Sequence, residues 1–255
     1  VQIAICGPES FLVSKSGVEV FRDLPTVAEP HAKLQIKLYR DRSEFKRCNR
    51  VGWAEAYYLA PYCHAYFSDN EINPHHWMLH EGVHQLNNEV THLHLAKWAE
   101  EGVAEYFSTS HLRNGRLELG NTDRNTYPVW WLDDLKLSGD LNTDLKNGTV
   151  IPLRAILNGY GGPSLDEKFN LYYLHWWSLT HLLFNGQNSR YRDHVVPLFR
   201  AGASLESFEK HIGPVEQLQT EWYQHVQQLQ WNLFHIGNTN YSSPRSIKSS
   251  SSSPR

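Results

Sequence analysis

The chain has 255 residues, of which 40% are hydrophobic and 20% charged, a size and composition that suit one large globular domain or two small ones. The net charge of -3 offers no basic surface for nucleic acid, and no apolar run approaches the ~20 residues of a membrane span. Cys6, Cys48 and Cys63 lack C-x-x-C spacing, which excludes a dense disulfide framework and a cysteine-based zinc site. One disulfide plus a free thiol remains open.

Residues 1–69 predict a small, β-rich N-terminal subdomain. Leu34, Ile36 and Leu38 alternate with polar neighbours, the pattern of a strand with one buried face. Residues 41–49 are polar enough for a turn or short helix. Two aromatic-rich candidate strands follow, 53–60 and 62–68, broken at Pro61. We expect an antiparallel sheet here.

The run Asn73–Leu86 predicts a helix that contains the pattern H-E-x-x-H. Asn73 is a good N-cap, and Pro74 suits the first helical position. Residues four apart lie on one helix face, so His80 and His84 can present two imidazole nitrogens to one ion. The stretch therefore predicts two zinc ligands from one helix, with Glu81 between them.

A second helix is predicted over Trp98–Phe107, and it supplies a third candidate ligand. Sixteen residues separate His84 from Glu101, enough to finish one helix and bring a second back beside it. Zinc at a catalytic site takes three protein ligands and keeps a fourth position open. Glu100, adjacent to Glu101, is expected to face solvent, because two neighbouring residues cannot both point at the metal.

The two motifs together resemble those of the gluzincin zinc metallopeptidases, most closely the peptidase-MA-like group. Trp98 and the run Glu101–Tyr106 look like the W-x-x-E-G-x-A-E-Y element that follows H-E-x-x-H in that family. The resemblance implies zinc (Zn2+) as the cofactor, held by His80, His84 and Glu101. It also implies that Glu81 is the general base that activates water, and that Glu105 is a second-shell carboxylate orienting a ligand histidine.

The resemblance further implies an α+β, zincin-like fold. It would have a small N-terminal antiparallel sheet, two active-site helices and an α-helical C-terminal lobe. A strand over residues 62–67 would be the edge strand that pairs with extended substrate. The chain has no G-x-M-E-N element, so the resemblance does not extend to the amine-binding device of aminopeptidase N.

Downstream residues predict a mostly helical region that ends in a tail. Expected helices cover 128–137, a nearly all-apolar segment 172–183 closing at Gly186, and 191–201, 204–212 and 214–230; residues 114–120 look like a hairpin or loop. Loops are expected at 138–150 and 158–166. Residues 70–232 would form the zincin-like catalytic region, and residues 233–255 a disordered, Ser-rich tail.

The apolar segment resembles the downstream Y-x-x-x-W-x-L element of peptidase-MA-like proteins, which implies Tyr173 as the catalytic donor to the oxyanion. Tyr172 and His181 remain alternatives, and plain core packing is the competing interpretation of this helix. His76 and His80 also share a helix face, but no Glu lies between them and their spacing to Glu101 does not match. Surface positions are expected for five histidines: His75, His76, His92, His94 and His111.

The sequence predicts a hydrolase: a zinc metallopeptidase that cleaves a peptide or protein substrate through metal-activated water. The alternative is a catalytically silent binding or scaffold domain with the same fold; the presence of Glu81 together with all three ligand candidates favours the enzyme. No nucleic-acid partner and no membrane span are expected, and oligomeric state stays open. The resemblance favours a secreted or periplasmic protein, although the chain begins at Val1 without a signal-peptide pattern.

Overall fold

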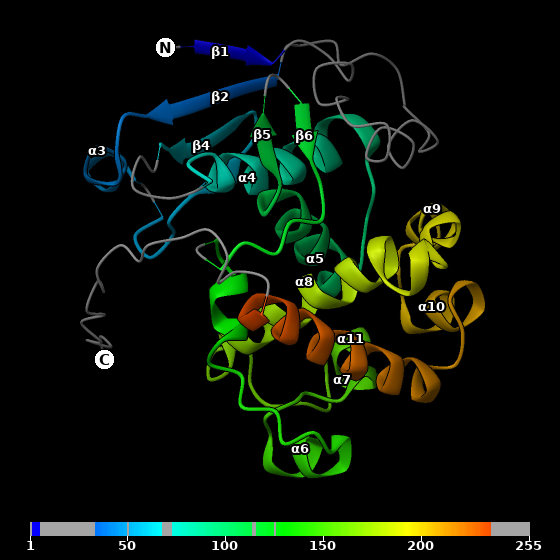
Figure 1. Ribbon diagram of the computed structural model, residues 1–255. Coiled ribbons are helices and arrows are strands. Elements are labelled where there is room, and N and C mark those ends of the chain that lie inside the picture. The colour runs from blue at the N-terminus through cyan, green and yellow to red at the C-terminus, as the bar shows by residue number, and fades with distance from the viewer. Residues whose placement is uncertain are drawn as a thin grey trace.

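A computed structural model describes residues 2–5, 34–49, 51–67, 73–113, 116–124 and 126–235. The elements stack in layers: the sheet packs on helix α4, α4 packs on α5, and α5 packs on α8 (Figure 1). The described part is therefore α+β and mostly helical. Within it, no helix combines the length and apolarity that crossing a membrane requires.

Four strands of the described part form one sheet in the order β1-β2-β4-β3. Their bounds are β1 (Gln2–Ile5), β2 (Leu34–Tyr39), β3 (Tyr57–Leu59) and β4 (Tyr62–Tyr66). The expectation of a purely antiparallel sheet is wrong, because β2 and β4 run parallel. Helix α3 (Arg42–Cys48) carries the chain across after β2, so that β4 returns in the same direction.

The prediction that residues 62–67 form the edge strand is also wrong. Strand β4 lies inside the sheet, with β2 on one side and β3 on the other. The hairpin at Pro61 folds the short strand β3 back onto β4, and β3 thereby becomes the edge on this side. The buried Cys63 and Ala65 of β4 then face the core.

Helix α4 (His76–Leu86) has the predicted extent at its C-terminal end but a different start. Its N-cap is His75, without a side-chain cap bond. Asn73 is buried, and its side-chain amide donates to the carbonyl oxygens of Ser108 and Ser110 at 2.6 and 2.7 Å. The amide nitrogen thus ties the entry of α4 to the end of α5, while the amide oxygen accepts a 3.4 Å bond from the N–H of His75, one residue before the helix begins. The chain continues from α4 into a π-helical turn, η1 (Asn87–Thr91).

Helices α5 (Lys97–Ser108) and α8 (Phe169–Asn185) form the centre of the helical part. Both were predicted, and the apolar α8 is buried along almost its whole length, with Trp177 and Leu179 completely inaccessible. Gly102 lies where the two helices are closest: a Cβ placed there would be 2.7 Å from the carbonyl oxygen of Trp176. The helices approach closely because this position has no side chain.

The region between α5 and α8 departs most from expectation. The helix predicted over 128–137 is only a 3-10 turn, η2 (Val129–Leu132). The carbonyl oxygens of Leu132 and Leu135 accept hydrogen bonds from the side-chain amide of Gln230 instead of from a continuing helix. The loop expected at 138–150 contains helix α6 (Leu141–Asn147), which Asp140 caps through a 2.7 Å bond from the Thr143 N–H. Helix α7 (Leu153–Asn158) follows.

The predicted strand 53–60 is reduced to β3, whereas the predicted hairpin and C-terminal helices are present. The hairpin pairs β5 (His111–Arg113) with β6 (Arg116–Glu118). The three expected C-terminal helices are α9 (Arg192–Arg200), α10 (Leu205–His211) and α11 (Val215–His235). Cys48 and Cys63 are free thiols. Cys6 and the Ser-rich tail beyond residue 235 lie outside the described residues.

Candidate metal centre

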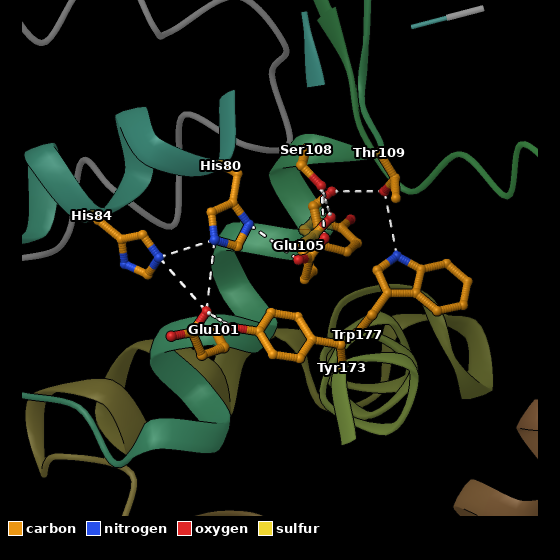
Figure 2. A network of polar contacts seen from close by, with 9 residues as sticks. His80, His84, Glu101, Glu105, Ser108, Thr109, Tyr173 and Trp177 are labelled. Atoms are coloured by element: carbon orange, nitrogen blue, oxygen red, sulfur yellow. Dashed lines mark hydrogen bonds and ion pairs between the residues drawn. The ribbon is translucent and has the colours of Figure 1, made fainter. Parts of the chain in front are cut away.

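Three side chains from α4 and α5 converge at the candidate site (Figure 2). His80 Nε2 and His84 Nε2 lie 3.1 Å apart, because one helical turn separates them on the same face. Glu101 Oε2 comes from α5 and lies 3.6 Å from His80 Nε2 and 3.7 Å from His84 Nε2. Among the described residues, this is the group of His, Cys, Asp and Glu side chains that could hold a metal ion.

The three donors fit a tetrahedral zinc ion by chemistry and by spacing. Zinc binds imidazole nitrogen and carboxylate oxygen at about 2.0–2.2 Å, so two ligands of one tetrahedral ion lie about 3.3–3.6 Å apart. The distances of 3.1, 3.6 and 3.7 Å are close to that range. Two imidazoles and one carboxylate also leave one tetrahedral position without a protein ligand.

Behind the donors, a second layer of side chains holds His80. Glu105 Oε1 lies 3.2 Å from Nδ1 of His80, and Glu105 is buried. The hydroxyl of Ser108 lies 3.0 Å from Oε2 of Glu105 and 2.8 Å from the Glu105 carbonyl oxygen, so its one hydrogen is shared between these two acceptors (Figure 2). Carboxylates placed on the far nitrogen of a ligand histidine fix its tautomer and ring orientation. The contacts therefore run from His80 through Glu105 to Ser108. No sequence motif had indicated Ser108.

Glu100 has a closer relation to the site than the sequence indicated. Its side chain is half-exposed, as expected, but Oε1 lies 3.8 Å from Nδ1 of His84. That separation is too long for a direct hydrogen bond and suits a bridging water. Both histidines thus have a carboxylate beside their far nitrogen.

The electrostatics of the cluster favour a bound cation. Burial alone opposes the charge on His80, but the carboxylates of Glu105 and Glu101 outweigh it and raise the pKa of His80 well above its ordinary value. Burial also opposes the charge on Glu101, but His80 and His84 lower its pKa to about 2. Burial, reinforced by the positive charge on His80, lowers the pKa of His84 to about 4. None of the described contacts of His80, His84 and Glu101 is with a lysine or an arginine.

Glu81 lies next to the donor set without belonging to it. The side chain is buried, and burial raises the pKa of Glu81 to about 7, against the opposing effects of His80 and of a backbone hydrogen bond with Tyr58 on β3. A carboxyl group with a pKa near neutrality is suited to accept and then return a proton.

Of the three candidates for a hydroxyl or imidazole donor, the structure brings Tyr173 to the site. Its hydroxyl donates to Glu101 Oε2 at 3.1 Å (Figure 2). Tyr172 instead donates to the carbonyl of Pro163 at 2.8 Å. His181 bonds to His225 at 2.9 Å and contacts the carbonyl of Gly120 at 3.2 Å.

The site opens into a cavity of about 750 Å³. Its lining includes His80, Glu81, His84, Glu101 and Tyr173, together with residues of the β3–β4 region and of the 127–131 turn. Tyr127 is a lining residue that sequence reasoning missed. Its ring packs against Tyr173 with centroids 5.9 Å apart.

The five histidines expected at the surface lie outside the donor set. His92 and His94 are exposed, as expected, while His75 and His111 are partly buried. The expectation of a surface position for His76 is wrong: it is 1% exposed, because its ring packs against Trp77 with centroids 4.0 Å apart.

No protein-family model matches the sequence, and a search among curated proteins finds no significant match.

Proposed function

We propose that the protein is a zinc-dependent metallopeptidase of the gluzincin type. The observation that carries the proposal is the meeting of His80, His84 and Glu101 within one ion's reach, with the buried carboxyl of Glu81 beside them in the same cavity. A structural zinc site commonly fills its fourth position with Cys or His. Here the set of three donors faces a cavity large enough for a substrate.

His80, His84 and Glu101 would hold the metal, and Glu105 with Ser108 would keep His80 in the required tautomer. The metal, when bound, supplies a Lewis acid that acidifies water and polarises a carbonyl group. Two tasks then remain for the side chains: transfer of the proton and stabilisation of the developing negative charge.

Glu81 is positioned to move the proton. Its carboxylate oxygen accepts a proton from the attacking water, and the resulting carboxylic acid returns that proton to the leaving amine nitrogen. Burial raises the pKa of Glu81 to about 7, above the ordinary value of a carboxyl group. The hydroxyl of Tyr173, which lies 3.1 Å from Glu101 Oε2, would donate a hydrogen bond to the carbonyl oxygen as negative charge develops on it.

The test separates metal binding from chemistry. We expect one zinc per chain by elemental analysis and chelator-sensitive cleavage of an internally quenched peptide library. Glu81→Gln should keep its zinc, because Glu81 is not a ligand, and lose at least ~10²-fold in activity. Glu101→Gln should weaken zinc binding itself, since a neutral amide is a poor ligand.

Glu206→Gln is the matched control, because it makes the same chemical change at an exposed position on α10. Absence of stoichiometric zinc would refute the metal assignment. Stoichiometric zinc without cleavage of any peptide would favour a silent binding domain instead.

A further inference from the structure

The rim of the cavity concentrates exposed apolar side chains. Six large hydrophobic residues are exposed in the described part of the chain, and four of them line this one cavity: Trp53, Leu59, Trp130 and Phe169. Trp53 is the extreme case, with 81% of its surface exposed. Scattered apolar residues are normal on a protein surface, but a concentration around one cavity marks a binding face.

These side chains form two groups from different parts of the fold. Trp53 and Leu59 come from the β3 region, while Trp130 and Phe169 come from the helical part. The second group is held in place by ring contacts: Trp130 meets Tyr127 edge to face at 5.5 Å, and Phe169 stacks on Tyr173 at 4.4 Å. A surface that is already packed loses little conformational freedom when a ligand binds.

Charge in the lining points to a neutral ligand. Beyond the candidate metal centre and its neighbouring carboxylates, the charged residues of the lining are Arg42 and Glu55. Arg42 and Glu55 pair through two 2.7 Å hydrogen bonds, and Lys46 lies 2.9 Å from the same carboxylate, so both charged residues of this part of the lining already have a partner. A charged side chain or chain terminus of a ligand would lose its hydration here. Arg42 and Glu55 already have partners, so neither offers it a free opposite charge.

We infer that the substrate is a neutral, interior stretch of polypeptide with bulky apolar side chains on both sides of the bond cleaved. An extended peptide directs successive side chains to opposite sides, so contact with both apolar groups requires apolar residues at adjacent positions. The inference rests on the proposed function for the cleavage step, while the binding preference follows from the cavity itself. It makes the protein an endopeptidase.

The test measures binding and cleavage separately, with end-blocked peptides that differ only at two central positions. The zinc-loaded Glu81→Gln protein should bind a Phe-Leu peptide about tenfold or more tightly than its Ser-Ser or Lys-Glu counterpart, by fluorescence anisotropy. The unmodified protein should cleave the Phe-Leu peptide fastest, and blocking the peptide ends should not slow it.

Variants then assign the preference to this cavity. Trp53→Ala and Trp130→Ala should each remove most of the discrimination between Phe-Leu and Ser-Ser peptides. Tyr160→Ala is the matched control, because Tyr160 is 73% exposed and lies outside the lining. Circular dichroism checks that each variant is folded.

The outcomes distinguish the two proposals. Cleavage without any preference for apolar residues overturns the inference and leaves the peptidase function intact. Tight, Trp130-dependent binding of the Phe-Leu peptide without cleavage supports the binding preference and overturns the peptidase function. A preference for free termini or for the charged peptide also overturns the inference.

Discussion

Replacing Gly102 by Ala tests whether the contact between α5 and α8 positions the candidate metal centre. The added Cβ would lie 2.7 Å from the Trp176 carbonyl oxygen and 2.5 Å from Thr180 Oγ1. The Thr180 side chain can rotate, but the carbonyl belongs to the backbone of α8. Ordinary contact begins at 3.4 Å, so the helices would have to separate locally by about 0.7 Å (3.4 minus 2.7).

Two opposing effects decide how much stability Gly102→Ala loses. Alanine favours a helix over glycine by about 1 kcal/mol. Overpacking a well-filled interface costs about 1–3 kcal/mol, and we expect the upper end here because a backbone atom cannot change rotamer. The net expectation for Gly102→Ala is therefore a decrease of about 2 kcal/mol in the free energy of unfolding. Because Glu101 is the adjacent residue, zinc affinity should also fall, by about tenfold.

Urea denaturation of the metal-free protein measures the first effect, and competition with a zinc chelator measures the second. Gly52→Ala serves as the control, since a Cβ at Gly52 meets nothing within 4 Å. It should leave the free energy of unfolding within about 0.5 kcal/mol of the parent value. If Gly102→Ala matched the parent protein in both stability and zinc affinity, the role assigned to this helix contact would be wrong.

Two further predictions concern side chains around the same core. Burial lowers the pKa of His181 to about 4 and that of His225 to about 3, so the folded state stays neutral where the unfolded state, with a pKa near 6.5, gains protons. The free energy of unfolding should therefore fall by about 1 kcal/mol per histidine between pH 6.5 and 5.5, and His225→Gln should flatten that dependence in urea titrations at each pH. Ser108→Ala should weaken zinc binding about tenfold, because it removes a contact to Glu105. Ser110→Ala is the control and should leave zinc binding unchanged, since the Ser110 hydroxyl bonds to the Tyr106 carbonyl. Equal zinc affinities of the two variants in chelator competition would contradict the positioning role of Ser108.

The sequence predicted the parts of the candidate site that local spacing determines. The distance between His80 and His84 is fixed by one helical turn, and the apolar length of α8 marks a buried helix without knowledge of its neighbours. The approach of Glu101 to this pair followed from motif resemblance and loop length, and the structure places the three side chains together.

What the sequence missed depends on partners far away in the chain. Asn73 has the chemistry of an N-cap, but the helix begins later, and the amide nitrogen of Asn73 donates to carbonyls at the end of α5, more than thirty residues away in the chain. Strand order depends on where α3 carries the chain after β2, which periodicity cannot report. Tyr127 carries no motif, and its place at the cavity depends on packing of its ring against Trp77, Trp130 and Tyr173.

The two hydrogen bonds from Asn73 have a consequence for how metal would enter. They join the start of the helix that carries both histidines to the end of the helix that carries Glu101, and Gly102 holds the second helix against α8. The protein's own contacts therefore fix the spacing of the ligand-bearing helices. Small zinc domains whose ligands are brought together only by the ion unfold when it is removed. In this chain the folded protein itself holds the ligand-bearing helices in place. We therefore expect the protein to stay folded when the ion is removed and to bind it again without refolding.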